Sequence, residues 1–325
     1  MLTSARAHMR VLVMGSDALT ARLLRALKPA ATQLHCVVPP DRPFGRRGLP
    51  TPCAAKAHCL ETGVGFTHAP ASSADEWTPV VDVARAFDLA VVFSFGYKLP
   101  PNVIAAPALG TVNIHPSLLP RYRGAAPIQH ALLNDDKETG VSLIEVHPAR
   151  FDVGDILAQQ THAIRDSHTL ASLSGELADV GSCMVLQLLQ GDELARARAQ
   201  RVHQADLAVP ASKASRLPSE LARADWSLPA RVLFNRARAL DKLRTSAKGQ
   251  ALSLSGVRPP RALHNQAGVG DVVADGDCVL VRCGDAQWLP FTRAQFDGKK
   301  ELDATVFAHG HMKGGRAFLC DDTAE

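Results

Sequence analysis

The chain has 325 residues, of which 46% are hydrophobic and 21% charged, with a formal net charge of +4. This composition is typical of a globular protein with room for two domains and a sizeable core. No apolar run approaches the roughly 18–20 residues of a membrane span. The seven cysteines form no C-x-x-C pair, which disfavours a disulfide framework or structural zinc and favours a reducing compartment. The mildly positive charge permits an anionic partner without requiring one.

The first two thirds of the chain alternate predicted strands and helices. Residues 10–14 predict a strand that ends at a glycine turn, and the helix that follows is capped by Ser16 or Asp17. Further strands are predicted at 33–38, 87–96, 111–115, 140–147 and 155–164, with helices before Gly63 and over 168–191. The alternation predicts a doubly wound α/β domain, in which sites lie at the carboxyl ends of strands. Three such ends fall at 14–15, 95–96 and 113–115.

The sequence changes character near residue 200. Residues 200–220 are polar and predict a linker, and a basic helix is predicted over 231–244. Short β-like pieces follow, separated by turns such as Asp275–Gly276. We therefore predict a catalytic domain at 1–204 and a small β-rich domain, of the barrel type, at 205–325.

Two motifs carry residues suited to catalysis. In "NIHPSLLP" (113–120), Asn113 and His115 are alternate residues of a strand end and share a face. An amide donor beside an imidazole suits stabilisation of an oxyanion and transfer of a proton. In "RFDVGDIL" (150–157), Asp152 offers a carboxylate that could orient a histidine. Taken singly, the first motif also fits a strand-end turn with an incidental histidine, and the second fits a surface turn.

Positive charge gathers in two places. The loop "PPDRPFGRRG" (39–48) contains Arg42, Arg46 and Arg47, and Arg121 and Arg123 follow the Asn-x-His motif. Guanidinium groups in such loops can bind phosphate, although a solvated basic loop is the alternative. No Walker loop, G-x-G-x-x-G, G-x-S-x-G or H-E-x-x-H motif occurs, which speaks against nucleotide hydrolysis, dinucleotide redox chemistry, serine hydrolysis and zinc proteolysis.

Residues 113–159, from "NIHPSLLPRYRG" to "RFDVGDILAQ", resemble the folate-dependent formyltransferases, most closely the members that act on methionyl-tRNA. "PPDRPFGRRGLPTP" (39–52) is similar to the basic loop of that family, and "RADWSLPARVLFNRARAL" (223–240) to its D-W-S region. The R-F-D-V-G form of the loop is more similar to mitochondrial members. Two stretches depart from the family: "RALDKLRTSAKGQ" (238–250) replaces its N-P-W-P-type segment, and G-S-D-A-L (15–19) lacks its usual aromatic residue.

The resemblance implies a Rossmann-like formyltransferase domain followed by an open, OB-like β-barrel that binds tRNA. It implies 10-formyltetrahydrofolate as formyl donor, the α-amine of methionyl initiator tRNA as acceptor, and no metal. The implied catalytic residues are Asn113, His115 and Asp152. The implied folate-binding residues are Phe95, Gly96, Tyr97, Leu99, Ser117, Leu118, Leu119 and Pro120, and the implied tRNA-binding residues are Arg42, Arg46, Arg47, Arg121 and Arg123.

Other expectations follow from the same resemblance. We expect a monomer in the mitochondrial matrix, with a bacterial-type cytoplasm as the alternative. Relatives with the same catalytic residues formylate a sugar-nucleotide amine or glycinamide ribonucleotide, or hydrolyse the folate, and the sugar-nucleotide enzymes are the most serious rival. A folate- or RNA-binding module without catalysis is a further alternative, which the three intact catalytic residues oppose.

Overall fold

The computed structural model describes residues 9–44, 48–72, 75–247, 249–263, 267–311 and 316–320. The chain forms two compact units. The first contains Met1–Pro127, Thr139–His162 and Ser174–Ser215, and the second contains Ile128–Glu138, Ala163–Leu173 and Arg216–Glu325. The division at 215–216 lies within the predicted linker, whereas the predicted domains met at 204–205.

The first unit is built on one sheet with the strand order β5-β2-β1-β6-β7-β8-β9. Its strands are β1 (Arg10–Met14), β2 (Gln33–Val38), β5 (Gly65–His68), β6 (Leu89–Val92), β7 (Thr111–His115), β8 (Glu138–Glu145) and β9 (Ile156–Ala163). The pairs from β5 to β7 are parallel, and β8 runs antiparallel to β7. The predicted strand ends at 14–15, 95–96 and 113–115 therefore lie at or just after the carboxyl ends of the adjacent strands β1, β6 and β7.

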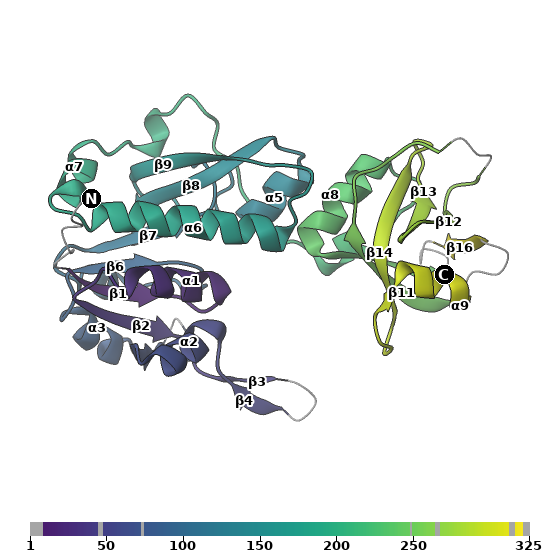
Figure 1. Ribbon diagram of the computed structural model, residues 1–325. Helices are drawn as coiled ribbons and strands as arrows, with labels where there is room; N and C mark the ends of the chain where they lie inside the picture. The colour runs from purple at the N-terminus through teal and green to yellow at the C-terminus, as the bar shows by residue number, and fades with distance from the viewer. Residues whose placement is uncertain are drawn as a thin grey trace, which may run out of the picture. The chain divides into compact units, whose positions relative to one another are not determined.

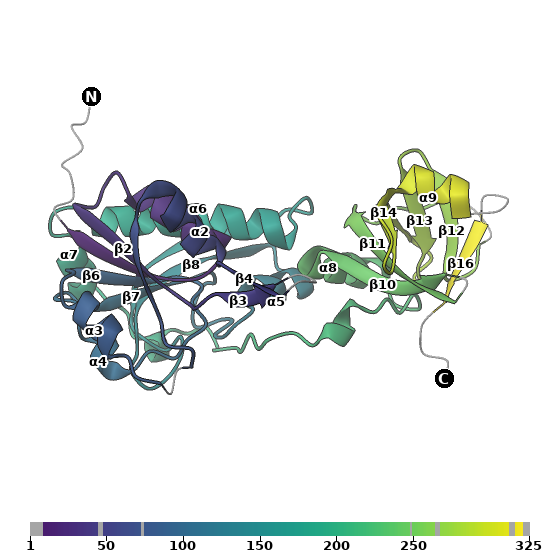
Figure 2. The same cartoon turned by 90° about the horizontal axis from the view of Figure 1, so that it is seen from below.

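Helices cover both faces of this sheet. They are α1 (Ala18–Leu27), α2 (Ala54–Thr62), α3 (Thr78–Ala84), α4 (Pro101–Ile104), α6 (Leu170–Leu188) and α7 (Glu193–Ala199). In Figure 2, α2 and α6 lie on one side of the sheet and α3 and α4 on the other. Asp17 caps α1 by accepting from the backbone N–H groups of Leu19 and Thr20. The doubly wound α/β prediction is thereby confirmed.

Helix α6 packs against the sheet through a glycine. A Cβ atom on Gly181 would lie 2.6 Å from Cγ2 of Ile114, a residue of β7. Only glycine permits so close an approach of the helix backbone to the strand that carries the Asn-x-His motif. None of the helices in the described ranges is long and apolar enough to cross a membrane.

The basic loop that follows β2 is partly a hairpin, which the sequence did not predict. Strands β3 (Arg42–Phe44) and β4 (Leu49–Thr51) pair antiparallel, with Arg42 opposite Thr51. Residues 45–47 come between these strands in the sequence, include the predicted Arg46 and Arg47, and lie outside the described residues. The extended hairpin can be followed in Figure 1.

The second unit is a β-barrel, which confirms the predicted β-rich domain. Its elements are α5 (Pro127–Leu133, all but the first residue), η2 (Ser219–Ala222), α8 (Ala230–Leu240), β10 (Lys242–Ala247), β11 (Gln250–Val257), β12 (Asp271–Asp275), β13 (Cys278–Arg282), β14 (Trp288–Phe296), β15 (Leu302–Asp303), α9 (Ala304–His311) and β16 (Arg316–Cys320). The strand order is β11-β10-β16-β12-β13-β14-β15, and β11 also pairs with β14. The pairings therefore return to their starting strand and close a ring.

The basic helix is shorter than predicted. Helix α8 ends at Leu240, and Asp241 adopts the left-handed conformation with φ +66°. Strand β10 begins at the next residue, with Leu243 and Thr245 buried and Arg244 exposed between them. Burial thus alternates over 243–245, as in a strand with one face in the core, and Ser246 and Ala247 after it are buried as well.

An ion-pair cluster explains why segments from the first part of the chain belong to the second unit. Arg231 on α8 binds both Asp135 and Asp166, and Arg238 lies 3.3 Å from Asp135. Burial raises the pKa of Asp135, but hydrogen bonds and charges from Arg231 and Lys137 outweigh it and lower the pKa to about 2. The carboxylates of 128–138 and 163–173 are thus anchored to α8.

The D-W-S segment anchors the barrel core. The Trp226 side chain is 1% exposed and lies within the hydrophobic core of the second unit. Its Nε1–H donates to Thr245 Oγ1 at 3.1 Å, and its ring meets Phe291 edge-on. The tryptophan therefore joins the entry segment to two strands of the barrel.

We predict that Trp226→Ala lowers the free energy of unfolding of the second unit by about 3–5 kcal/mol, the usual cost of truncating a buried large aromatic residue. Differential scanning calorimetry measures the effect as a lowered transition temperature. Val306→Ala, at a position 53% exposed in the same unit, is the control and should leave the transition unchanged. Equal melting of the two variants would contradict the anchoring role of Trp226.

Candidate active site

Asn113 and His115 occupy the end of β7, as the sequence predicted. Strand β7 ends at His115, and the two residues pair with Ile144 and Ser142 of β8. Because they alternate on one strand, both side chains project to the same side of the sheet. The Asn113 side chain is half-buried, and its amide has no hydrogen-bond partner among the described residues. It is therefore free to donate to a ligand.

The structure brings His115 and Asp152 together. Nδ1 of His115 lies 3.5 Å from Oδ1 of Asp152, and both side chains are largely buried. The other ring nitrogen, Nε2, lies 2.9 Å from the backbone carbonyl oxygen of Tyr122. Both nitrogens thus face acceptors, and a protonated imidazole would donate to both. The arrangement fixes the ring plane between a carboxylate and a carbonyl.

Asp152 reaches this position through a strained backbone. Its φ is +54°, in the left-handed region that costs a non-glycine residue on the order of 1–3 kcal/mol. Its second carboxylate oxygen, Oδ2, accepts from the backbone N–H of Gly124 at 2.9 Å. The carboxylate is therefore shared between His115 and the loop that follows the Asn-x-His motif.

Close packing of the backbone requires a glycine in the D-x-G-D loop. A Cβ atom on Gly154 would lie 1.7 Å from the carbonyl oxygen of Glu145, which no side chain tolerates. The N–H of Glu145 in turn donates to the Asp155 carbonyl at 3.0 Å. The Asp155 carboxylate is bound by His203 and Arg201. Only the first aspartate of the loop faces the histidine.

The segment 117–120 is held by a buried hydrogen-bond network. The Ser117 carbonyl accepts from the Ser142 hydroxyl at 2.6 Å, and that hydroxyl accepts from the N–H of Leu119. Gln159 donates to both the Leu119 carbonyl and the Ser142 hydroxyl at 2.8 Å. Ser117 and Leu119 are buried, as is Pro120, while Leu118 is half-buried. These hydrogen bonds hold the backbone of 117–119 against β8 and β9.

The predicted strip from Phe95 to Leu99 follows β6. Phe95 and Leu99 are buried in the core beneath it, and Gly96 is exposed with φ +74°. The ring centroids of Phe95 and Tyr97 lie 4.7 Å apart. The Tyr97 hydroxyl is buried and has no hydrogen-bond partner among the described residues, so it can take one from a ligand.

The predicted basic residues differ in their surroundings. Arg42 is exposed on β3. The Arg121 guanidinium lies over the ring of Tyr122, 5.0 Å from its centre. Arg123 donates from Nε and a terminal nitrogen to Oε1 of Gln204, at 2.9 and 2.7 Å. Burial and the nearby Arg150 lower the pKa of Arg123.

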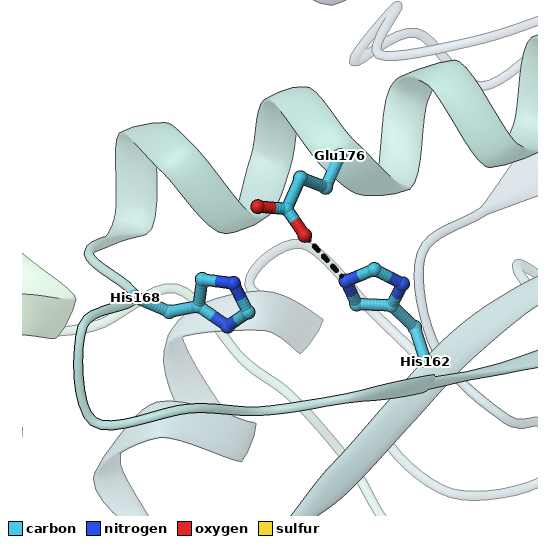
Figure 3. Close-up of side chains that lie close together, drawn as sticks. All are labelled: His162, His168 and Glu176. Atoms are coloured by element: carbon cyan, nitrogen blue, oxygen red, sulfur yellow. Dashed lines mark hydrogen bonds and ion pairs between the residues drawn. The ribbon is translucent and has the colours of Figure 1, made fainter.

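One group of side chains has the composition of a metal site. In Figure 3, His162 on β9 points toward Glu176 on α6, and Nε2 of His162 lies 2.8 Å from the carboxylate. His168 is bound through both ring nitrogens by Arg165, at 3.1 and 2.8 Å. Because protein partners already engage these nitrogens, we assign the contacts to the fold and not to a metal.

Three groups in the site were missed by sequence reasoning. The Tyr122 carbonyl and the Gly124 N–H belong to the backbone, so no residue type announces them. Gln204 lies in the predicted linker, where a lone glutamine gives no signal. Its Nε2 donates to the carbonyl oxygens of Asp152 and Gly154 at 3.0 and 2.8 Å.

Comparison with known families and proteins agrees with this geometry. Residues 9–189 match the model described as formyl transferase, and residues 216–312 match the formyl transferase C-terminal domain. A methionyl-tRNA formyltransferase of Methylococcus capsulatus is 35% identical over 95% of this chain and 99% of its own length. The one of Moorella thermoacetica is 33% identical over 96% of this chain and 100% of its own.

Solved structures share the fold. HypX of Aquifex aeolicus in complex with tetrahydrofolic acid superposes with a TM-score of 0.61 at 18% identity, covering 94% of this chain, which spans 48% of HypX. WlaRD, a sugar 3N-formyl transferase, superposes with a TM-score of 0.57 at 14% identity, covering 90% of this chain and 99% of that one. The predicted fold class is thereby confirmed. With both family models matched and relatives aligned over nearly its whole length, this chain belongs to the formyl transferase family.

Proposed function

We propose that this protein transfers the formyl group of 10-formyltetrahydrofolate to the α-amine of methionyl initiator tRNA. The observation that carries the proposal is the meeting of Asn113, His115 and Asp152 in one site of a formyl transferase. The full-length similarity to methionyl-tRNA formyltransferases supports the choice of acceptor. The product is N-formylmethionyl-tRNA, which initiates translation.

The chemistry begins with attack of the neutral amine on the formyl carbon. A new C–N bond forms, and negative charge develops on the formyl oxygen. The Asn113 amide, which has no partner among the described side and main chains, donates to that oxygen. One such donor contributes typically about 3–4 kcal/mol to stabilisation of the transition state. The bond from the formyl carbon to N10 then breaks, and N10 takes a proton.

His115 and Asp152 stabilise the developing negative charge and transfer the proton that the amine loses. A protonated His115 adds positive charge beside the developing oxyanion, and Asp152 at 3.5 Å orients its ring. The Nε2–H donates to the Tyr122 carbonyl. This hydrogen bond can switch to the formyl oxygen, because an oxyanion is the stronger acceptor. The pair also relays the proton that the amine loses. No step requires a metal.

The folate fits the aromatic strip after β6. The half-buried Tyr97 ring, which packs on the core residue Phe95, offers a stacking surface, and its unpartnered hydroxyl offers a polar contact. Gly96 leaves the backbone open to close approach of a ring. The half-buried Leu118 and the backbone of 117–120 form the facing wall.

Arginine side chains supply positive charge for binding the phosphates of the tRNA. Arg42 on the β3–β4 hairpin is exposed, and Arg46 and Arg47 stand at the turn between those strands in the sequence. Phosphate contacts from this hairpin would position the acceptor stem. Arg121, stacked on Tyr122, adds charge near the catalytic residues.

Compartment and assembly are further proposals. The R-F-D-V-G loop supports the mitochondrial matrix, whereas the bacterial relatives support the alternative, a bacterial-type cytoplasm. Imaging of the tagged full chain in eukaryotic cells distinguishes the two. We propose a monomer, which analytical ultracentrifugation tests.

We predict that Asn113→Ala lowers kcat by roughly 100- to 1000-fold, the usual effect of losing one oxyanion donor. His115→Ala and Asp152→Asn should each abolish measurable formyl transfer with little change in melting temperature. Steady-state formylation assays with calorimetry measure both. The matched control is His68→Ala, which removes an exposed histidine on β5. Turnover like that of the unaltered protein in any of the three variants would contradict the assigned role.

We predict that Arg46→Ala raises the KM for tRNA roughly tenfold and leaves the KM for folate unchanged. A charge-assisted hydrogen bond contributes about 1.5–3 kcal/mol, and about 1.4 kcal/mol corresponds to a factor of ten. Arg85→Ala, at an exposed arginine that ends α3, is the matched control. A defect confined to folate would refute the assignment.

The proposed acceptor is tested by a comparison of substrates. Purified protein and 10-formyltetrahydrofolate are incubated with methionyl initiator tRNA, methionyl elongator tRNA or a sugar-nucleotide amine. We expect the highest kcat/KM for the initiator tRNA. Preference for the sugar-nucleotide amine would establish the rival activity, and folate binding without transfer to any acceptor would establish a non-catalytic module.

A further inference from the structure

The segment that follows α7 grips the loop that carries Asp152. The backbones of Val202 and Ile156 exchange two hydrogen bonds of 2.9 Å. Arg201 and His203, the two neighbours of Val202 in the chain, bind the carboxylate of Asp155. The next residue, Gln204, binds the backbone of Asp152 and Gly154 in the same loop. We call residues 201–204 the strap.

Gln204 makes every hydrogen bond that its side chain allows to one region. Its Oε1 accepts two N–H groups of Arg123, at 2.9 and 2.7 Å. Its Nε2 donates to the carbonyl oxygens of Asp152 and Gly154, at 3.0 and 2.8 Å. The side chain is 5% exposed. A buried amide with all these partners has a fixed orientation.

The contact lies where the loop is most strained. Asp152 adopts φ +54°, and such a conformation persists in a non-glycine residue only when surrounding contacts hold it. The Asp152 carbonyl is held by Gln204, and its carboxylate by the N–H of Gly124. Arg123, next to Gly124, is bound by the same glutamine. Gln204 thus ties together the two loops whose spacing sets the contact between Asp152 and His115.

We propose that Gln204 is a positioning residue for formyl transfer, which holds Asp152 in the left-handed conformation that aims its carboxylate at His115. This inference rests on the proposed function for its kinetic readout. Gln204 does not touch the reacting atoms; it acts through Asp152. Without it, the loop relaxes and the carboxylate moves away from the imidazole.

The test combines Gln204→Leu with Asp152→Asn in a double-mutant cycle. We expect Gln204→Leu to lower kcat on the order of 100-fold, as a displacement of about 1 Å in an active site does, with the KM for tRNA nearly unchanged. Because Asp152→Asn alone abolishes measurable turnover, the cycle is completed with the NMR signals of the His115 imidazole. In the Asp152→Asn background, Gln204→Leu should leave these signals unchanged, because a residue that acts through Asp152 has nothing left to position. An equal shift of the His115 signals in both backgrounds would overturn the proposal.

The matched control is His203→Ala. It removes a neighbouring contact of the strap, to Asp155, and leaves Gln204 in place, so kcat should stay within about twofold of the unaltered value. Gln204→Glu is the second variant: it keeps the acceptor for Arg123 and removes both N–H donors to the loop, and we expect the same loss of kcat. If His203→Ala equals Gln204→Leu, or if both Gln204 variants are unfolded at the assay temperature, the residue serves the fold and the proposal fails.

A readout without turnover separates this proposal from the proposed function. In NMR spectra of the full chain, the imidazole signals of His115 should shift in Gln204→Leu toward those of Asp152→Asn and remain unchanged in His203→Ala. Shifts of this kind in a protein that formylates no acceptor would uphold the positioning role and reject the function. Unchanged His115 signals in Gln204→Leu would reject the positioning role.

Discussion

The contact between Asp152 and His115 constrains much of the first unit. The Asp152 side chain is only 12% exposed, and a buried carboxylate is costly unless charged or hydrogen-bonding groups surround it. Here the groups come from the end of β7 and the loop after it, which carry His115 and the Gly124 N–H, and from the loop after β8, which carries Asp152 itself. Each loop must therefore be held at a fixed distance from the other. The hydrogen bonds among Ser117, Ser142 and Gln159 hold the first, and Gln204 holds the second.

The order of the strands makes this meeting possible. Strand β7 is the last parallel strand, and β8 runs back beside it. The carboxyl end of β8 therefore lies beside the start of β7, away from His115. The loop after β8 must return along the sheet to reach the site. Gly154 allows that return, because its backbone passes against the carbonyl of Glu145 at a distance that excludes any Cβ. The glycine between the two aspartates is thus as necessary to the site as the carboxylate.

The sequence predicts those parts of the structure that side-chain identity determines. Apolar runs located β1, β6 and β7, and the residue types of Asn113, His115 and Asp152 indicated their chemistry. The hairpin β3–β4 and the end of α8 were missed, because short strand pairings and a left-handed Asp241 depend on tertiary contacts. The Tyr122 carbonyl and the Gly124 N–H could not be predicted, since every residue carries such groups. The assignment of 128–138 and 163–173 to the second unit depends on ion pairs with α8, which only the fold brings together.

The surroundings of the basic residues bear on how an anionic acceptor is bound. The guanidinium of Arg123 is bonded to Gln204, and burial lowers the pKa of Arg123. A phosphate that bound Arg123 would have to displace the glutamine that holds Asp152. Such a displacement would loosen the catalytic loop at the moment when the acceptor arrives. The positive charge that meets tRNA is therefore better supplied by groups outside this network. Arg42 on the exposed hairpin meets that condition, and the separation lets phosphate binding and the alignment of Asp152 vary independently.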